Sequence, residues 1–163
     1  MNKNVHFSSQ SDDWETPDEF FHELNKVFHF GLDVCASATN AKCERYFTRE
    51  DDALTQEWKG TVWMNPPYGR QIGDFMKKAY EESLKGATVV CLVPSRTDTE
   101  WWHRYAKHGL CIFIRRRLKF GGSANAAPFP SAIVIFFGGR LGEATKPIED
   151  LFWPDTGSRK AHA

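Results

Sequence analysis

The sequence predicts an α/β fold, with a mainly parallel sheet that is covered by helices on both faces. Segments typical of strands alternate with segments typical of helices along the 163 residues. The stretch 87–93 (A-T-V-V-C-L-V) is apolar throughout, as expected of a central strand buried on both faces. A hydrophobic content of 41% and an aromatic content of 14% are typical of one domain with a substantial core.

The chain begins with a polar stretch, and we expect residues 1–13 to form a flexible N-terminus. Thr16 then predicts a helix N-cap, followed by Pro17 at the first helical position and by Glu19 as the second half of a capping box. Apolar residues follow at helical spacing and predict about three turns: Phe20, Leu24, Val27 and Phe28.

Two short strands and two turns are expected next. The apolar stretch 30–34 predicts a strand that runs into the small residues 35–38, and 45–48 is a plausible second strand. An acidic turn at 50–52 precedes the apolar stretch 61–64, which predicts a buried strand. That strand ends at Asn65-Pro66-Pro67-Tyr68.

The second half of the chain continues the alternation. An amphipathic helix is expected from Ile72 to a stop at Gly86, then the strand 87–93, and then a helix that ends near Lys107. Further strands are predicted at 110–114 and 131–137, joined by a loop rich in Gly, Ala and Pro at 121–130. We therefore expect one domain at 14–140 and a C-terminal tail at 141–163, with a weak apolar cluster at 151–153.

The sequence composition predicts the cellular compartment of the protein and the state of its cysteines. No apolar run approaches the ~20 residues that span a membrane, and the N-terminus lacks the apolar stretch of a signal peptide, so we expect a cytoplasmic protein. Its four cysteines form no CxxC pair and no cluster with zinc spacing: Cys35, Cys43, Cys91 and Cys111. We expect them to be reduced, and we expect no metal.

Zero net charge hides a strong asymmetry. Residues 1–60 hold twelve acids and six bases, whereas residues 101–142 hold seven Arg and Lys and no Asp or Glu. Local charge of this kind attracts a polyanion even when the total is zero. The alternative interpretation is that these Arg and Lys residues form an ordinary solvated surface. We consider it the weaker interpretation, because an ordinary surface segment of 42 residues would be expected to include acids.

Asn65-Pro66-Pro67-Tyr68 is the most informative motif. Consecutive prolines fix φ and donate no hydrogen bonds, so the neighbouring carbonyls can accept from a ligand. Asn65 adds an amide oxygen and Tyr68 adds a flat aromatic face. Acceptors held beside a stacking ring suit a planar base that carries an amino group. Since ligands bind at the carboxyl ends of strands in such sheets, the position of the motif supports this interpretation.

Four stretches, in this order, resemble the small phage-type adenine-N6 DNA methyltransferases: Trp14 to Pro17, 32–37, Asn65 to Tyr68, and 117–120 before the turn 128–131. The resemblance runs from about Trp14 to Phe137 and implies a compact Rossmann-like methyltransferase fold. It implies S-adenosyl-L-methionine as cofactor, double-stranded DNA as partner and a phage origin.

The resemblance also implies the cofactor site. Asp33 would accept from the methionine amino group, and the small residues after it, which include no glycine, would let the backbone approach the cofactor. The first helical turn would offer N–H groups to the methionine carboxylate. The implied cofactor-binding residues are Trp14, Thr16, Pro17, Asp33, Cys35, Ala36, Ser37, Asp52 and Asn65. Alternatively, Asp33 caps the strand end.

The target adenine would be flipped out of the duplex, because it cannot be reached inside it. Asn65 and the Pro66 carbonyl would accept its amino hydrogens, Pro67 would keep the motif rigid, and Tyr68 would stack on the base. Phe120 would cover the other face of the base or belong to the core. Basic residues would bind phosphates, or read a guanine edge: Arg115, Arg116, Arg117 and Lys119. We expect short or relaxed sequence specificity.

Other substrates and one other class remain open. The acceptor amine could be cytosine N4, an RNA base or a protein glutamine. Asn at position 65 and the acid-free basic segment favour adenine and a nucleic acid. A non-catalytic nucleic-acid-binding module is the alternative of another class, and calorimetry with S-adenosylmethionine separates it from an enzyme.

Overall fold

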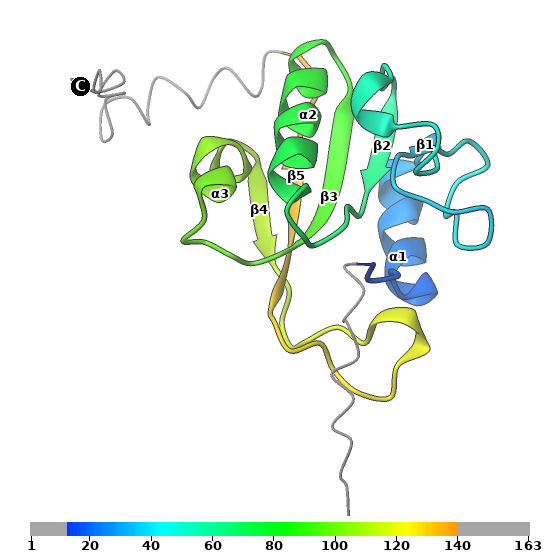
Figure 1. Ribbon diagram of the computed structural model, residues 1–163, viewed down its shortest axis with the longest axis vertical. Helices are drawn as coiled ribbons and strands as arrows, with labels where there is room; N and C mark the ends of the chain where they lie inside the picture. The colour runs from blue at the N-terminus through cyan, green and yellow to red at the C-terminus, as the bar shows by residue number, and fades with distance from the viewer. Residues whose placement is uncertain (1–12, 140–163) are drawn as a thin grey trace, which may run out of the picture.

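The protein is built around one five-stranded sheet with the strand order β1-β2-β3-β5-β4 (Figure 1). The structure, a computed structural model, describes residues 13–139. The strands are β1 (Leu32–Asp33), β2 (Thr61–Met64), β3 (Thr88–Pro94), β4 (Leu110–Phe113) and β5 (Ser131–Phe136). The predicted C-terminal tail and its apolar cluster, and nearly all of the predicted N-terminal segment, lie outside the described residues.

The sheet is mixed, which confirms the α/β class but does not confirm the predicted mainly parallel layout. β1 pairs with β2 and β2 with β3 in parallel, whereas β5 runs antiparallel to both β3 and β4. The physical reason lies in the connection between β4 and β5. A parallel return needs a crossover, usually a helix, and residues 114–130 supply only a loop with one 3-10 turn.

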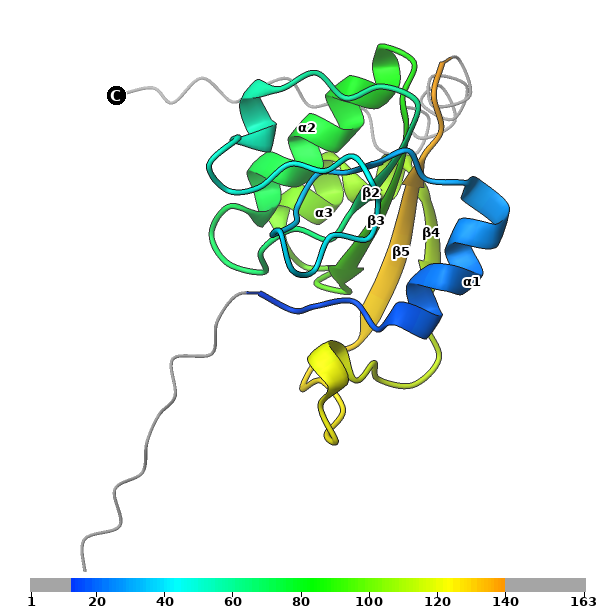
Figure 2. The ribbon, with the colours of Figure 1, turned by 90° about the vertical axis from the view of Figure 1, so that its right-hand side faces the viewer.

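Helices cover both faces of the sheet (Figure 2). α1 (Asp18–Phe28) packs on one face, where the ring of Phe21 lies 5.4 Å from that of Trp63 on β2. α2 (Ile72–Leu84) and α3 (Glu100–Arg104) lie on the other face, where Tyr80 of α2 meets Phe136 of β5 with 5.9 Å between ring centroids.

β3 and β5 form the centre of the core. All six residues of β5 are buried, and so are all residues of β3 except Thr88, as expected of strands covered on both faces. β4 is an edge strand, and three of its side chains are exposed: Leu110, Ile112 and Phe113.

Several predicted boundaries are corrected. Residues 45–48 form no strand: only one parallel bridge joins Tyr46 to Asp33. The predicted strand 30–34 is reduced to β1, and the helix expected to reach Lys107 ends at Arg104 and is followed by the 3-10 turn Ala106–His108. The extent of β1, and the absence of a strand at 45–48, depend on backbone pairing with residues distant in the chain, which a local sequence pattern does not specify.

The predicted capping box at α1 is wrong. The helix begins at Asp18, its N-cap is Pro17, and no side chain caps it. Thr16 is instead 3% exposed, and its hydroxyl is engaged elsewhere, as described below.

A buried carboxylate ties α2 to the chain that leads into β2. Glu82 is fully buried and accepts hydrogen bonds from Trp58 N (3.1 Å), Lys78 Nζ (2.7 Å) and Lys85 Nζ (2.9 Å). Burial acts to raise the pKa of Glu82, but these three donors outweigh it and hold the pKa below its ordinary value near 4.5. The carboxylate therefore stabilises the strand that ends at Asn65.

We predict that Glu82→Gln lowers the free energy of unfolding at pH 7 by about 1–3 kcal/mol, because it removes a charge that satisfies three donors. Since the pKa is depressed in the folded state, this contribution is complete above the ordinary pKa and is lost as pH falls through the folded value. Denaturant unfolding of parent and variant from pH 7 to pH 3 measures the difference.

The matched control is Glu81→Gln, because Glu81 is the neighbouring, exposed glutamate with its nearest ion-pair nitrogen at 3.8 Å. It should change stability by less than about 0.5 kcal/mol. Equal losses in both variants would contradict the assignment.

Candidate active site

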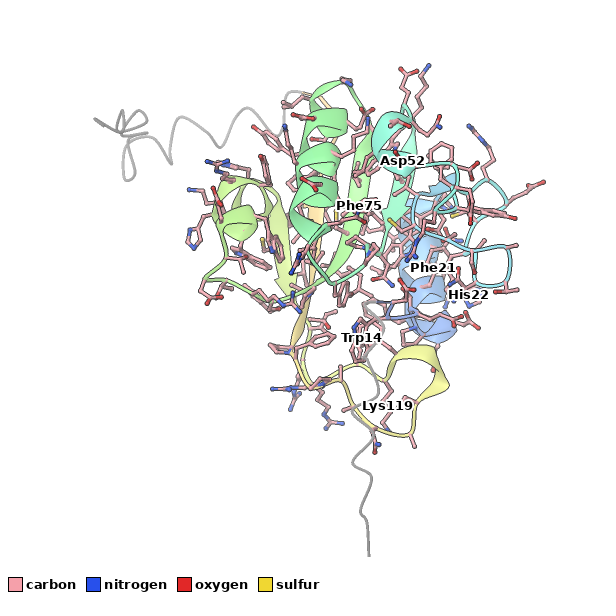
Figure 3. The ribbon with its side chains drawn as sticks, viewed as in Figure 1. Trp14, Phe21, His22, Asp52, Phe75 and Lys119 are labelled. Atoms are coloured by element: carbon pink, nitrogen blue, oxygen red, sulfur yellow. The ribbon has the colours of Figure 1, made fainter. Side chains whose placement is uncertain are left out.

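A cavity of about 820 Å³ opens at the carboxyl ends of β1 and β2. Its walls come from the N-terminal segment, the loop after β1, the turn around Asp52, the Asn-Pro-Pro segment and α2, of which Figure 3 labels Trp14, Asp52 and Phe75. The predicted site residues that line it are Trp14, Cys35, Ala36, Ser37, Asp52, Asn65, Pro66 and Pro67. Thr16, Pro17, Asp33 and Tyr68 lie outside its lining.

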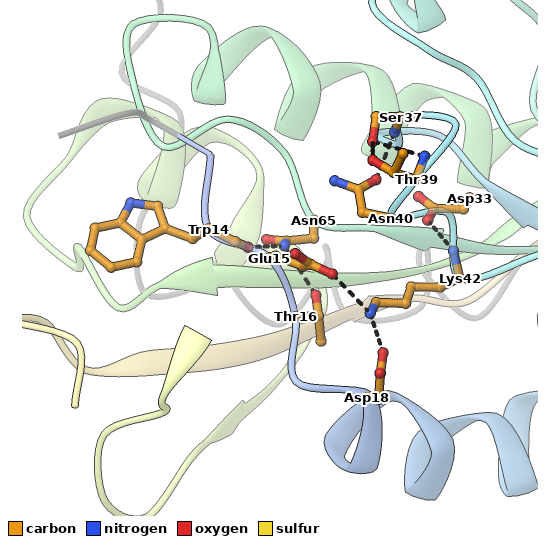
Figure 4. Close-up of polar contacts among 10 residues, drawn as sticks. All are labelled: Trp14, Glu15, Thr16, Asp18, Asp33, Ser37, Thr39, Asn40, Lys42 and Asn65. Atoms are coloured by element: carbon orange, nitrogen blue, oxygen red, sulfur yellow. Dashed lines mark hydrogen bonds and ion pairs between the residues drawn. The ribbon is translucent and has the colours of Figure 1, made fainter. Parts of the chain in front are cut away.

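Residues 14–16, here called the N-terminal strap, cross the end of β2 and hold Asn65 (Figure 4). Asn65 Nδ2 donates to the main-chain carbonyl of Trp14 and, at 3.0 Å, to Thr16 Oγ1. The strap also joins the loop between β4 and β5, because Gly121 N donates to Glu15 O at 2.9 Å.

The two polar atoms of the Asn65 amide therefore differ in their hydrogen bonding among the described residues. Its nitrogen makes both contacts with the strap. Its oxygen, Oδ1, is buried and accepts no hydrogen bond from any described residue. An unpaired buried carbonyl oxygen is costly, so this atom is a strong candidate to accept from a ligand.

Tyr68 lies deeper than the motif suggested. It is 3% exposed, and its hydroxyl donates to Leu92 O at 3.1 Å. Burial raises the pKa of Tyr68 well above its ordinary value, so the phenol stays protonated. The rings of Phe120 and Phe129 lie against the Tyr68 ring in T-shaped arrangements, with centroid distances of 6.1 and 5.5 Å. Phe120 is 4% exposed and belongs to the core, one of the two alternatives considered for it.

Trp14 of the strap packs against the same two phenylalanines that contact Tyr68. The ring of Trp14 lies 5.5 Å from that of Phe120 and 4.9 Å from that of Phe129, both edge to face. The strap and the loop 114–130 are thus joined by both packing and a backbone hydrogen bond.

Arg96 was not singled out from the sequence, yet it supports the motif directly. It follows β3, and its Nη1 donates to the carbonyl oxygen of Tyr68 at 3.1 Å. The signal available in the sequence was its position just after Pro94, at the same sheet edge as Asn65.

Asp33 takes the strand-capping role rather than lining the cavity. It is 2% exposed, its Oδ1 accepts from Cys35 N at 3.1 Å, and its Oδ2 accepts from Lys42 N at 3.0 Å. Burial raises the pKa of Asp33, and the two backbone N–H donors act in the opposite direction. The carboxylate closes the loop that forms one wall of the cavity.

Lys42 is a second residue that sequence reasoning missed. Its side chain is 9% exposed and forms ion pairs with Asp18 and, at 3.8 Å, with Glu15. It therefore links the loop after β1 to the strap and to the start of α1 (Figure 4). No local pattern marks it, because its partners lie far away in the chain.

Asp52 lines the cavity in a left-handed conformation, with φ of 50°. Such values are uncommon outside glycine, although Asp tolerates them better than most residues. Asp52 precedes the 3-10 turn Ala53–Thr55, and its carbonyl accepts a hydrogen bond from Thr55 N at 2.9 Å.

Comparison with known proteins shows the family of the chain. Residues 4–136 match the family model described as DNA N-6-adenine-methyltransferase (Dam). The chain belongs to this family. A DNA N-6-adenine-methyltransferase of Haemophilus phage HP1 is 34% identical over 146 residues, which cover 83% of this chain and 84% of that protein. One from Escherichia phage T1 is 34% identical over 92 residues, which cover 55% of this chain and 38% of the T1 protein.

Two negative findings concern residues 13–139 only. No helix there is long and apolar enough to cross a membrane. No group of three or more His, Cys, Asp or Glu side chains is arranged there to hold a metal ion.

The basic segment of this family member lies on the loop between β4 and β5. Four of its side chains are exposed: Arg115, Arg116, Arg117 and Lys119. Lys119 lies on the part of this loop beyond Trp14 (Figure 3), directly before the 3-10 turn Phe120–Gly122. Arg116 has a φ of 69°, so the chain turns sharply within the run. The segment therefore presents positive charge beside the strap, without an acid of its own.

We predict that Asp33→Ala lowers the free energy of unfolding by about 2–4 kcal/mol, because it leaves two backbone N–H donors without their acceptor. The amides of Cys35 and Lys42 should lose protection in hydrogen exchange, while those of β3 keep theirs relative to global unfolding. The exposed Asp74→Ala is the control and should change neither quantity. Unchanged protection at Cys35 and Lys42 would contradict the capping role.

Proposed function

We propose that this protein transfers a methyl group from S-adenosylmethionine to the N6 amino group of adenine in DNA. The observation that carries the proposal is Asn65 Oδ1, a buried acceptor without a hydrogen-bond donor among the described residues, on a residue that lines a cavity of cofactor size. Membership of the DNA N-6-adenine-methyltransferase family supports the same reaction.

The cavity suits the cofactor in size and charge. Its volume of about 820 Å³ falls within the range of ~300–1,000 Å³ common for small-molecule sites. S-adenosylmethionine carries a sulfonium and an ammonium group, and acids outnumber bases in the lining: Asp13, Glu15, Glu50 and Asp52 against Arg49. The residues that would hold it are Trp14, Cys35, Ala36, Ser37 and Asp52.

When bound, the cofactor would supply a methyl group already activated by the sulfonium and would leave as the neutral thioether, while the methylated amino group would release one proton to solvent after the transfer. The protein contributes alignment. Asn65 Oδ1 and the Pro66 carbonyl accept the two hydrogens of the adenine amino group, which draws its nitrogen lone pair out of the ring system. Alignment of this kind can supply roughly 7–11 kcal/mol in favourable cases.

The base reaches this position by flipping out of double-stranded DNA. Tyr68 then stacks on it, with its ring fixed by the hydrogen bond to Leu92 O and its carbonyl by Arg96. Because Phe120 and Phe129 now contact that ring, the base enters by displacing the aromatic residues of the loop 114–130. The exposed basic residues of the same loop bind the phosphates beside the flipped nucleotide.

We predict that the purified protein transfers label from methyl-labelled S-adenosylmethionine to N6-methyladenine in unmethylated DNA. Asn65→Ala should lower kcat by at least ~100-fold, because it removes Oδ1. The hydrogen bond from the adenine amino group to this atom strengthens as positive charge develops on the nitrogen. Nucleoside mass spectrometry measures the product, and calorimetry establishes that the variant still binds the cofactor.

Each other outcome has a defined meaning. Label in N4-methylcytosine would keep the mechanism and change the substrate. Label in RNA or in a protein glutamine, with none in DNA, would replace DNA as substrate. Absence of cofactor binding by the parent would favour a nucleic-acid-binding module.

We also predict that DNA binding depends on the basic segment. Arg115→Gln and Lys119→Gln should each lower the slope of log Kd against log salt concentration, by about one unit for each phosphate that the side chain neutralises in the parent. Fluorescence anisotropy with a duplex, at salt concentrations between about 50 and 300 mM, gives the slope.

Lys59→Gln is the control for this measurement. Lys59 is exposed and precedes β2, so it lies at the sheet edge opposite Asn65. Its removal should leave the slope unchanged. Equal slopes for all three variants would show that the loop does not bind phosphates.

A further inference from the structure

We propose that Thr16 is a positioning residue that, together with the Trp14 carbonyl, sets the orientation of the Asn65 amide. The inference rests on the proposed function, in which Asn65 Oδ1 accepts from the amino group of the target base. It extends that function to a residue that lies outside the cavity lining and is joined to it through the hydrogen bond with Asn65.

The orientation follows from the chemistry of the two partners. The Trp14 carbonyl can only accept, so the amide atom that faces it must be the nitrogen. Thr16 Oγ1 then accepts the second N–H of the same nitrogen, at 3.0 Å. Both hydrogens of Nδ2 are thereby used, and Oδ1 is directed away from the strap.

The opposite orientation is doubly unfavourable. Rotating the amide by half a turn would bring Oδ1 against the Trp14 carbonyl oxygen, two acceptors without a hydrogen between them. It would also aim the Nδ2 hydrogens at the base, where the amino group is itself a donor. The strap therefore selects the orientation that can bind an amine, before any substrate arrives.

Thr16 makes this hydrogen bond in place of a local one. Its position in the sequence favours a cap of α1, but α1 has no side-chain cap, and the Thr16 hydroxyl is 49 residues from its partner in the chain. A Thr cap is typically worth about 1 kcal/mol. Retaining a buried threonine that does not cap its helix is consistent with a task at Asn65.

The first test compares Thr16→Val, which keeps the shape but removes the hydroxyl, with Thr16→Ser, which restores an acceptor. Thr16→Val should lower kcat by about 2- to 12-fold, the effect of losing one ordinary hydrogen bond. The KM for S-adenosylmethionine should stay within about twofold, because Thr16 lies outside the cavity lining. Thr16→Ser should recover most of kcat.

A spectroscopic readout separates positioning from general stability. The Asn65 side-chain NH₂ resonances, assigned by comparison with Asn65→Ala, should be two distinct and slowly exchanging signals in the parent. In Thr16→Val at least one should move and exchange faster, at a temperature where thermal unfolding shows the variant to be folded. Unchanged kcat and unchanged amide signals in Thr16→Val would overturn the proposal.

The second test uses Asn65→Asp. A carboxylate at this position would face the Trp14 carbonyl and the Thr16 hydroxyl, and burial beside the carbonyl acceptor should raise its pKa. The Thr16 hydroxyl can donate to either form, but only the protonated form, through its one O–H, can donate to the Trp14 carbonyl as Nδ2 does. The activity of this variant, divided by that of the parent, should therefore rise by at least ~10-fold as pH falls from 8 to 6.

Parent and variant share every other charged group near this position, so the ratio reports on the new carboxyl alone. These groups are the cavity residues Asp13, Glu15, Arg49, Glu50 and Asp52, together with Arg96 behind Tyr68 and Lys42 beside Glu15. A ratio that does not change with pH would overturn the proposal.

Failure of this proposal differs from failure of the proposed function. If the parent methylates adenine and Asn65→Ala does not, but Thr16→Val behaves as the parent, only the role of Thr16 is refuted. If the parent transfers no methyl group, the reaction itself is wrong, while the amide resonances still test whether Thr16 orients Asn65.

Discussion

The N-terminal strap is held at two places. The Asn65 amide joins it to the end of β2, and Glu15 joins it to the loop between β4 and β5. Asn65 ends β2, Trp14 and Thr16 precede α1, and Glu15 accepts a hydrogen bond from Gly121 in the loop between β4 and β5. The strap belongs to no helix or strand, so its position at the end of β2 depends on these contacts. Because both hydrogens of Asn65 Nδ2 are used to hold it, the strap and the amide define each other's orientation.

The mixed sheet explains why the strap and the basic loop meet at the same edge. β1, β2 and β3 run in one direction, and their carboxyl ends form the edge that carries Asn65. β5 is antiparallel to β3 and to β4, so β4 ends, and β5 begins, at that same edge. The register places Ser131 opposite Pro94. A helical crossover would have carried residues 114–130 over a face of the sheet, away from the cavity.

Sequence patterns located the motif correctly but not all of its neighbours. The strand before Asn65, the helix after it and the buried strand that became β3 follow from apolar periodicity, which is a local signal. Thr16 was assigned to a helix cap because that partner is near in the chain, whereas its actual partner is 49 residues away. Lys42 and Arg96 were missed for the same reason, since each acts through a distant group. The direction of β5 depends on pairing across the sheet, which periodicity does not specify.

The loop after β1 shows how a cavity wall can be built without glycine. A glycine-rich turn serves where the backbone must adopt positive φ or approach a ligand closely. Among residues 13–139, the non-glycine positions with positive φ are His29, Asp52 and Arg116, so the loop at 35–38 needs no such conformation. Its backbone is shaped instead by the Asp33 carboxylate, which accepts from the N–H groups of Cys35 and Lys42. Asp52, with a φ of 50°, is a left-handed residue that also lines the cavity, so neither the loop at 35–38 nor the turn at Asp52 uses a glycine there.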